Sequence, residues 1–129
     1  MREEGSGADV KKVSLNELKT KLDGGSAVIL IETLSPDEYK RGHLPGAVNI
    51  PSNQIAELSG SVLPDKSAEI VLYCSGPKCH ASENAARELE QVGYSNISVY
   101  AEGKEGWLKA GMQFEALSKT EPSPLINRD

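Results

Sequence analysis

Short apolar runs rich in β-branched residues recur along the chain and predict buried strands. The strongest runs cover residues 27–32, 47–50, 69–74 and 97–100. Each run is mostly apolar rather than alternating, which is typical of strands covered on both faces of a sheet. Minor extended segments are predicted at residues 11–13 and 113–117.

Helical patterns separate these runs. Ser14 and Glu17 match a capping box, which predicts a helix over residues 15–22. The clearest helix begins at Ser82 and ends at Gly93, and its apolar stripe consists of Ala85, Ala86, Leu89 and Val92. Shorter helices are predicted at residues 36–41, 53–58 and 105–110, with a loop at residues 60–66. Because strands alternate with helices, we predict an α/β fold with a parallel sheet and helices on both faces.

Length and composition indicate one soluble domain. The chain has 129 residues, of which 38% are hydrophobic and 26% charged. We place the domain at residues 10–118, between flexible segments at residues 1–9 and 119–129. The first residues lack the apolar region of a signal peptide, and the longest apolar run, residues 27–31, is too short to span a bilayer. We therefore expect a cytoplasmic protein without a membrane-spanning segment.

Charge and cysteine content narrow the function further. The net charge is -5 and the pI is about 5.1, which argues against nucleic acid or an anionic membrane as partner. An anionic substrate must therefore be captured by a local site. The 2 cysteines are too few for a disulfide framework, and they form no CxxC pair that would suggest zinc. We expect a reducing compartment, no metal site and no cofactor.

One loop carries the candidate chemistry. Cys74 lies at the carboxyl end of a predicted strand, which is where parallel sheets bind ligands. Backbone amides in the following turn, close to a helix N-terminus, can converge on one point, and Gly76 permits unusual backbone conformations. These amides would stabilise a thiolate, so we predict a Cys74 pKa below the value of about 8.5 for a free cysteine. Cys74 is the candidate nucleophile, and the candidate substrate-binding residues are Ser75, Gly76, Lys78, Cys79 and His80.

Each of these residues also has a simpler interpretation. From local features alone, Cys74 fits a small buried hydrophobe as well as it fits a nucleophile. Cys79 could be a resolving thiol, but a loop-packing role is favoured. A solvent-facing position is favoured for His80 over proton donation or contact with an oxyanion. Lys78 is equally compatible with substrate capture and with a solvated loop position.

Three residues outside the loop are interpreted as structural. His43 is expected to fix a turn by hydrogen bonding to the backbone. Glu32 ends a buried strand and needs a partner, so structural pairing is favoured over work as a general base. Trp107 is expected to anchor the last helix in the core.

Four blocks of sequence resemble the rhodanese family. Residues 42–51 read GHLPGAVNIP, which is very similar to that family's GH-[IL]-PGA-x-N-[IL]-P segment. Residues 28–32 resemble its first hydrophobic strand, residues 69–74 its active-site strand and cysteine, and residues 103–111 its C-terminal GGxxxWxxxG segment. The blocks occur in family order and cover about residues 13–117. The loop at residues 74–82 also matches the C-x-G-P-x-C-x-x-S form that several rhodanese-like proteins carry.

The resemblance implies a five-stranded parallel sheet flanked by helices on both faces, with the cysteine cradled by loop amides. It also implies a sulfurtransferase reaction. The Cys74 thiolate would attack the outer sulfur of a small anionic donor such as thiosulfate and release sulfite. The Cys74 persulfide would then pass its sulfur to cyanide or a thiol. A protein persulfide could be a partner.

The chain departs from the family pattern at three places. Leu34 stands where the family often has an arginine, so the ion pair of that arginine is expected to be absent. No arginine lies in the loop at residues 74–82, and Glu102 replaces the first glycine of the Gly-Gly pair. These departures leave open a sulfur carrier or binding module that shows little turnover with thiosulfate. A phosphatase-like or arsenate-reducing activity is not favoured, because it needs a C-x5-R loop and His80 occupies the arginine position.

Overall fold

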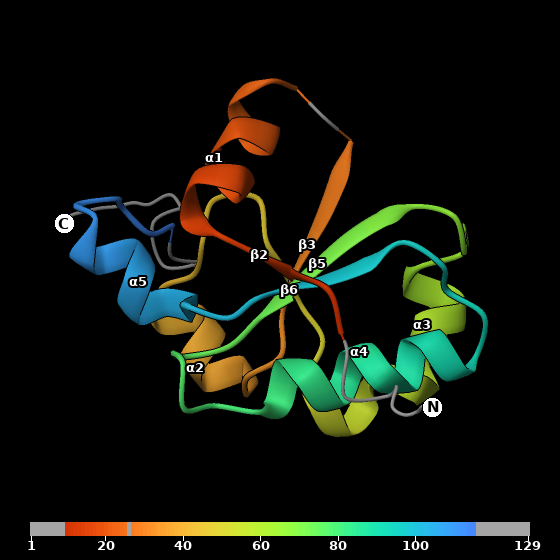
Figure 1. Ribbon diagram of the computed structural model, residues 1–129. Coiled ribbons are helices and arrows are strands. Elements are labelled where there is room, and N and C mark those ends of the chain that lie inside the picture. The colour runs from red at the N-terminus through yellow and green to blue at the C-terminus, as the bar shows by residue number, and fades with distance from the viewer. Residues whose placement is uncertain (1–9, 26, 116–129) are drawn as a thin grey trace, which may run out of the picture.

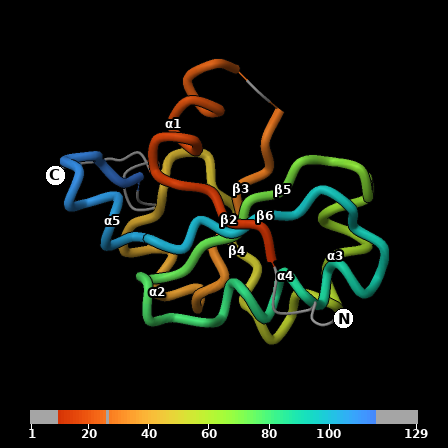
Figure 2. The backbone as a smooth tube through the Cα atoms, viewed as in Figure 1, coloured from red at the N-terminus to blue at the C-terminus, as the bar shows by residue number. Residues whose placement is uncertain are grey.

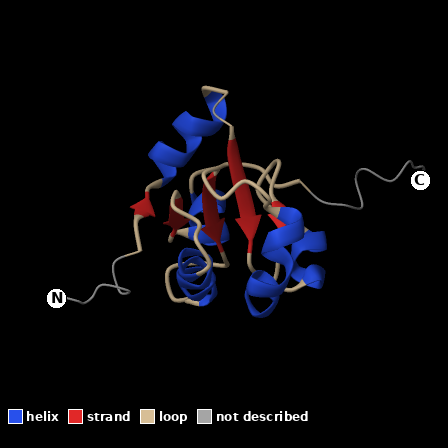
Figure 3. Ribbon diagram, turned by 90° about the vertical axis from the view of Figure 1, so that its right-hand side faces the viewer, coloured by secondary structure: helices blue, strands red, loops and turns tan. Residues whose placement is uncertain are grey.

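The computed structural model describes residues 10–25 and 27–115 and contains a five-stranded parallel sheet. The strands are β2 (Lys12–Val13), β3 (Val28–Glu32), β4 (Val48–Asn49), β5 (Glu69–Tyr73) and β6 (Ile97–Tyr100). Their order across the sheet is β2-β6-β5-β3-β4, and every neighbouring pair is parallel. Figure 3 shows strands running in the same direction between helices. The predicted α/β fold with a five-stranded parallel sheet is therefore confirmed.

Helices connect the strands, and the largest differences from the predicted boundaries are the end of α3 and the start of α5. The helices are α1 (Leu15–Asp23), α2 (Pro36–Arg41), the 3₁₀ turn η2 (Ser52–Gln54), α3 (Ile55–Val62), α4 (Ala81–Gln91) and α5 (Gly103–Lys109). The predicted start of a loop at residue 60 is wrong, because α3 continues to Val62. Ile55, Ser59 and Leu63 are all buried and four residues apart, so burial along this face extends the helix. Helix α5 begins at Gly103, two residues before its predicted start.

Two hydrophobic clusters cover opposite faces of the sheet. Helices α3 and α4 pack on one face, while α1 and α5 pack on the other (Figure 1). Side chains of β5 alternate between them, with Ile70 and Leu72 in the first cluster and Val71 and Tyr73 in the second. Continued alternation directs the next residue, Cys74, toward the face covered by α4. The two-sided burial explains why the strand sequences are continuously apolar.

Capping interactions fix where helices begin. The predicted box at Ser14 and Glu17 is confirmed, with the Ser14 hydroxyl accepting from the Glu17 amide. A second box, not predicted, joins Ser35 and Glu38 and starts α2 with a proline in its first turn. This box sets the direction of the chain just beyond the end of β3.

The predicted ends of the domain lie partly outside the described residues. Segments 1–9 and 119–129 lie there, as do the last three residues of the predicted domain. Of the extended segment predicted at residues 113–117, Glu115 forms an isolated antiparallel bridge with His43. Among residues 10–25 and 27–115, no helix combines the length and apolar character needed to cross a membrane.

Candidate functional site

The candidate nucleophile lies where β5 meets the loop to α4. Cys74 follows the last residue of β5 and is only 2% exposed. Its sulfur lies 3.6 Å from the hydroxyl oxygen of Ser82, the second residue of α4. Figure 2 traces the loop from the end of β5 to the start of this helix. The N-terminal end of a helix carries partial positive charge, so this position would favour a thiolate when Cys74 is reduced.

A tight turn returns the loop toward Cys74. The Cys79 amide donates a 3.0 Å hydrogen bond to the Gly76 carbonyl, which closes a four-residue turn. Pro77 occupies the second position of this turn, where its fixed φ angle is favourable. The turn brings the Cα atom of Cys79 to 6.3 Å from that of Cys74, and the two sulfurs form a disulfide.

The disulfide bears on the interpretation of Cys79. Sequence favoured loop packing over a resolving thiol, whereas the structure bonds Cys79 to Cys74, and the part that Cys79 plays in a reaction stays a prediction. The separation of five residues gave the only sequence signal for this contact. The decisive information was the turn at Gly76, which the sequence analysis did not assign.

The start of α5 holds the first part of the loop. The amide of Lys104 donates to the Cys74 carbonyl at 3.0 Å, and the amide of Glu105 donates to the Ser75 carbonyl at 2.9 Å. Gly103 makes this approach possible, since its φ angle is 63° and a β-carbon there would lie 2.5 Å from the Cys74 carbonyl oxygen. The sequence analysis noted Gly103 only as part of a family segment.

A buried ion pair lies beneath the site. Glu32 is fully buried, and its Oε2 atom lies 2.8 Å from Nζ of Lys104. Its other oxygen accepts a 2.8 Å hydrogen bond from the Tyr73 hydroxyl, which itself accepts from the Leu44 amide. Burial, followed by the Glu32 carboxylate, raises the pKa of Tyr73. The expectation of structural pairing for Glu32 is confirmed.

Lys104 forms an ion pair at the end of β3, although no arginine stands at Leu34. The arginine is absent at Leu34, but a lysine from α5 supplies the positive charge from another part of the chain. The ion pair therefore joins the end of β3 to α5, the helix in which the Lys104 amide donates to the Cys74 carbonyl. Sequence reasoning missed this contact because the two residues are separated by most of the domain.

The remaining candidate residues lie at different places around the sulfur. Ser75 and Lys78 are exposed on the loop, whereas Gly76 is buried. A β-carbon at Gly76 would lie 2.7 Å from the carboxyl carbon of Glu105, so an acidic side chain covers this part of the loop. The structure thus gathers Ser75, Gly76 and Cys79 around Cys74 and leaves Lys78 at the rim.

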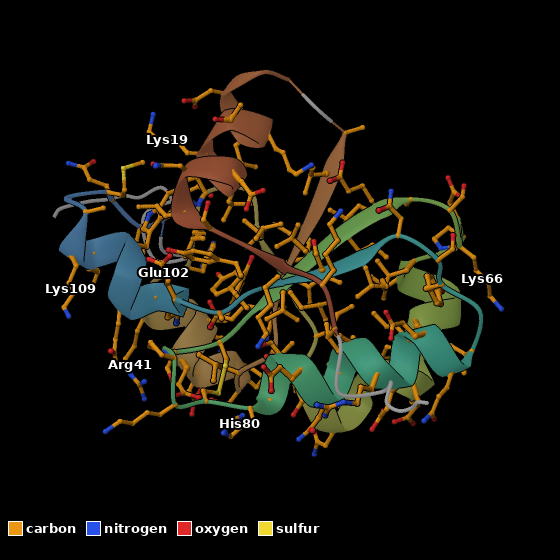
Figure 4. All side chains as sticks on the ribbon, viewed as in Figure 1. Lys19, Arg41, Lys66, His80, Glu102 and Lys109 are labelled. Atoms are coloured by element: carbon orange, nitrogen blue, oxygen red, sulfur yellow. A yellow bond between two sulfur atoms is a disulfide. The ribbon has the colours of Figure 1, made fainter. Side chains whose placement is uncertain are left out.

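His80 does not belong to this group. Its side chain is 72% exposed, and Nδ1 lies 3.2 Å from the Glu83 carboxylate. Figure 4 shows His80 at the start of α4, pointing away from the sheet. Glu83 also forms a 2.8 Å salt bridge with Lys12, and Lys12, followed by His80, holds the pKa of Glu83 below its usual value. The solvent-facing interpretation of His80 agrees with this position.

His43 and Trp107 have the structural roles expected from sequence. Nδ1 of His43 lies 2.8 Å from the Tyr39 carbonyl oxygen, and the two rings stack. Trp107 is 3% exposed and donates from its indole nitrogen to the Gln113 carbonyl.

An open cleft lies beside the loop. Its volume is about 410 Å³, and it is bordered by residues 33–36 after β3, residues 51–54 after β4, and Ala81 at the start of α4. Glu38 is the one charged residue among the described residues that line it. Cys74 is not among the residues that line this cleft.

Comparison with known proteins identifies relatives of this domain. A model of the rhodanese-like domain family matches residues 14–110, which include the whole candidate loop. An HTH-type transcriptional regulator of Mycobacterium tuberculosis is 29% identical over 106 residues, covering 82% of this chain and 45% of that protein. The thiosulfate sulfurtransferase PspE of Escherichia coli is 30% identical over 67 residues, covering 52% of this chain and 62% of that protein. This chain therefore spans less than two thirds of the length of either curated relative.

A solved structure gives the same result. The human single-domain sulfurtransferase TSTD1 is similar with a TM-score of 0.68 and 27% sequence identity, covering 78% of this chain and 96% of that one. Together with the family match, this similarity shows that the fold is the same. It does not identify the donor or the acceptor.

Proposed function

We propose that this chain, which belongs to the rhodanese-like domain family, is a sulfurtransferase that carries sulfane sulfur as a persulfide on Cys74. The observation that supports the proposal most strongly is the place of the Cys74 sulfur, 3.6 Å from Ser82 at the N-terminus of α4. A helix N-terminus favours a thiolate as the attacking group and then a persulfide anion as the intermediate.

The reaction begins from reduced Cys74. The thiolate attacks the outer sulfur of a donor such as thiosulfate, so a new sulfur–sulfur bond forms and the original one breaks. The bonding electrons leave with sulfite. An acceptor such as cyanide or a thiol then attacks the outer sulfur of the persulfide and restores the thiolate.

Backbone hydrogen bonds around Cys74 hold its sulfur in position. The amides of Lys104 and Glu105 fix the carbonyls of Cys74 and Ser75, so the sulfur keeps its place relative to α4 through both steps. Donor capture depends on local charge because the chain is acidic overall. Lys78 supplies a positive charge at the rim. The negative charge of Glu105, whose carboxylate lies against Gly76, acts against it.

The experiment that tests this proposal is sulfur loading of the reduced chain. Thiosulfate is added, and sulfite release and thiocyanate formation with cyanide are measured. Wild type should release sulfite and form thiocyanate, whereas Cys74→Ser should do neither, because the attacking atom is gone. Undiminished thiocyanate production by Cys74→Ser would show that Cys74 is not the nucleophile.

A sulfur carrier is the second candidate, and one observation favours it. The loop at residues 74–82 contains no arginine that could clamp a dianionic donor. A carrier should load slowly from thiosulfate and quickly from a protein persulfide, whereas an enzyme for thiosulfate should use that donor well. A phosphatase-like activity is not proposed, because His80 occupies the arginine position and its ring lies against Glu83.

A further inference from the structure

We infer that Cys79 is a second reacting thiol, which expels the sulfur carried by Cys74 as sulfide and closes the Cys74–Cys79 disulfide. This inference rests on the proposed function, because it begins from the Cys74 persulfide. It adds an intramolecular acceptor that competes with cyanide and external thiols. The chain would then convert thiosulfate to sulfite and sulfide at the expense of a dithiol reductant.

The loop geometry supports direct attack on the inner sulfur. The turn closed between Gly76 and Cys79 lets the Cys79 sulfur bond to the Cys74 sulfur itself. In the persulfide, the inner sulfur is this same atom, so the required approach already exists in the structure. The two cysteines are separated by only five residues in the sequence. A short tether of this kind gives a local concentration that a thiol free in solution does not reach.

The chemistry of the leaving group permits this reaction. Attack by the Cys79 thiolate on the inner sulfur breaks the bond to the outer sulfur, which takes the electron pair, picks up the proton released by the Cys79 thiol and leaves as hydrosulfide. Hydrosulfide is the conjugate base of a stronger acid than a typical cysteine thiol, so it is able to leave. Attack on the outer sulfur would instead expel the Cys74 thiolate and only move the persulfide to Cys79.

The complete cycle balances in atoms and electrons. Thiosulfate and two thiols of the chain give sulfite, hydrosulfide and one disulfide, with the thiol protons passing to hydrosulfide and solvent. The outer sulfur of thiosulfate is reduced by two electrons, and the two cysteines together lose two electrons. A dithiol such as dithiothreitol then reduces the disulfide by thiol exchange and is itself oxidised.

The different burial of the two cysteines decides which sulfur a reductant reaches at the end of the cycle. Cys74 is 2% exposed, whereas Cys79 is half-buried at the end of the turn. A reductant can therefore reach the Cys79 sulfur more readily and would restore Cys74 as the leaving thiolate at the α4 N-terminus. This is the sulfur whose thiolate the helix stabilises.

A single turnover without any added thiol tests the inference. The chain is reduced with dithiothreitol, desalted without oxygen and mixed with excess thiosulfate. Sulfite, sulfide and free thiols are measured together with the intact mass. Wild type should give about one sulfide for each sulfite and end as the disulfide, with no added sulfur. Cys79→Ser should release sulfite, keep one added sulfur atom and give roughly tenfold less sulfide, because the attacking thiol is missing.

The variants separate failure of the inference from failure of the proposed function. Cys79→Ser should still form thiocyanate with cyanide, which also shows that it is folded. A stable Cys74 persulfide on wild type, with Cys79 still a free thiol and no sulfide released, would overturn the role of Cys79 and leave the sulfurtransferase proposal standing. Absence of sulfite from both wild type and Cys79→Ser would instead overturn the sulfurtransferase proposal.

Discussion

Replacement of Lys104 by methionine should destabilise the domain strongly, because it leaves a buried carboxylate without its partner. Glu32 is fully buried, and its Oε2 atom lies 2.8 Å from the Lys104 ammonium. Breaking one side of a buried ion pair costs about 3–5 kcal/mol. The Lys104 side chain is 14% exposed, so water already solvates part of its charge and the lower end, about 3 kcal/mol, is expected.

The loss can be measured by urea unfolding followed by circular dichroism, with dithiothreitol present so that the disulfide is reduced in every variant. A loss of about 3 kcal/mol corresponds to a fall in Tm of roughly 12 °C for a domain of this size. Lys109→Met is the matched control, since Lys109 lies exposed in the last turn of the same helix. It should cost less than about 1 kcal/mol.

A second change distinguishes loss of charge pairing from simple loss of packing. Adding Glu32→Gln to Lys104→Met removes the unpaired charge but keeps an oxygen that can accept from Tyr73. The double variant should recover about 1–2 kcal/mol relative to Lys104→Met alone. The reasoning is refuted if Lys104→Met and Lys109→Met have equal stability, or if Glu32→Gln lowers the stability of Lys104→Met further.

Two further predictions concern the loop. Gly103→Ala should impair sulfur loading of Cys74, since the β-carbon would lie 2.5 Å from the Cys74 carbonyl oxygen. Gly111→Ala is the control, because Gly111 also has a positive φ angle but open space around it, and this variant should load normally. Equal loading by both variants would contradict the positioning role of Gly103. Lys78→Ala should reduce kcat/KM for thiosulfate about fivefold, because the lost contact with an exposed charge is worth about 1 kcal/mol. Added salt should lower kcat/KM of the wild type in the same direction, because salt screens that charge. Lys19→Ala, far from the loop in Figure 4, should leave the rate unchanged, and an unchanged rate for Lys78→Ala would favour the sulfur carrier.

Local sequence patterns determined most of the secondary structure. The capping box at Ser14 depends on residues three positions apart, and the buried strands depend on continuous apolar runs, so both can be recognised in short windows. Alternation of strands and helices then determined the parallel sheet, and the position of Cys74 after a buried strand followed from the same pattern. The boundary of α3 was missed because burial of Leu63 depends on packing against distant residues.

Only the tertiary structure decided what surrounds Cys74. The disulfide with Cys79 requires the turn closed by the Gly76 carbonyl, and the spacing of two cysteines does not specify that turn. The partner of Glu32 comes from α5, and no local pattern joins residues 72 positions apart in the sequence. Sequence by itself therefore determined the elements and the place of Cys74 at the end of a strand, since these follow from neighbouring residues. The contacts around Cys74 come from the turn at Gly76 and from the start of α5, and local sequence patterns specify neither of them.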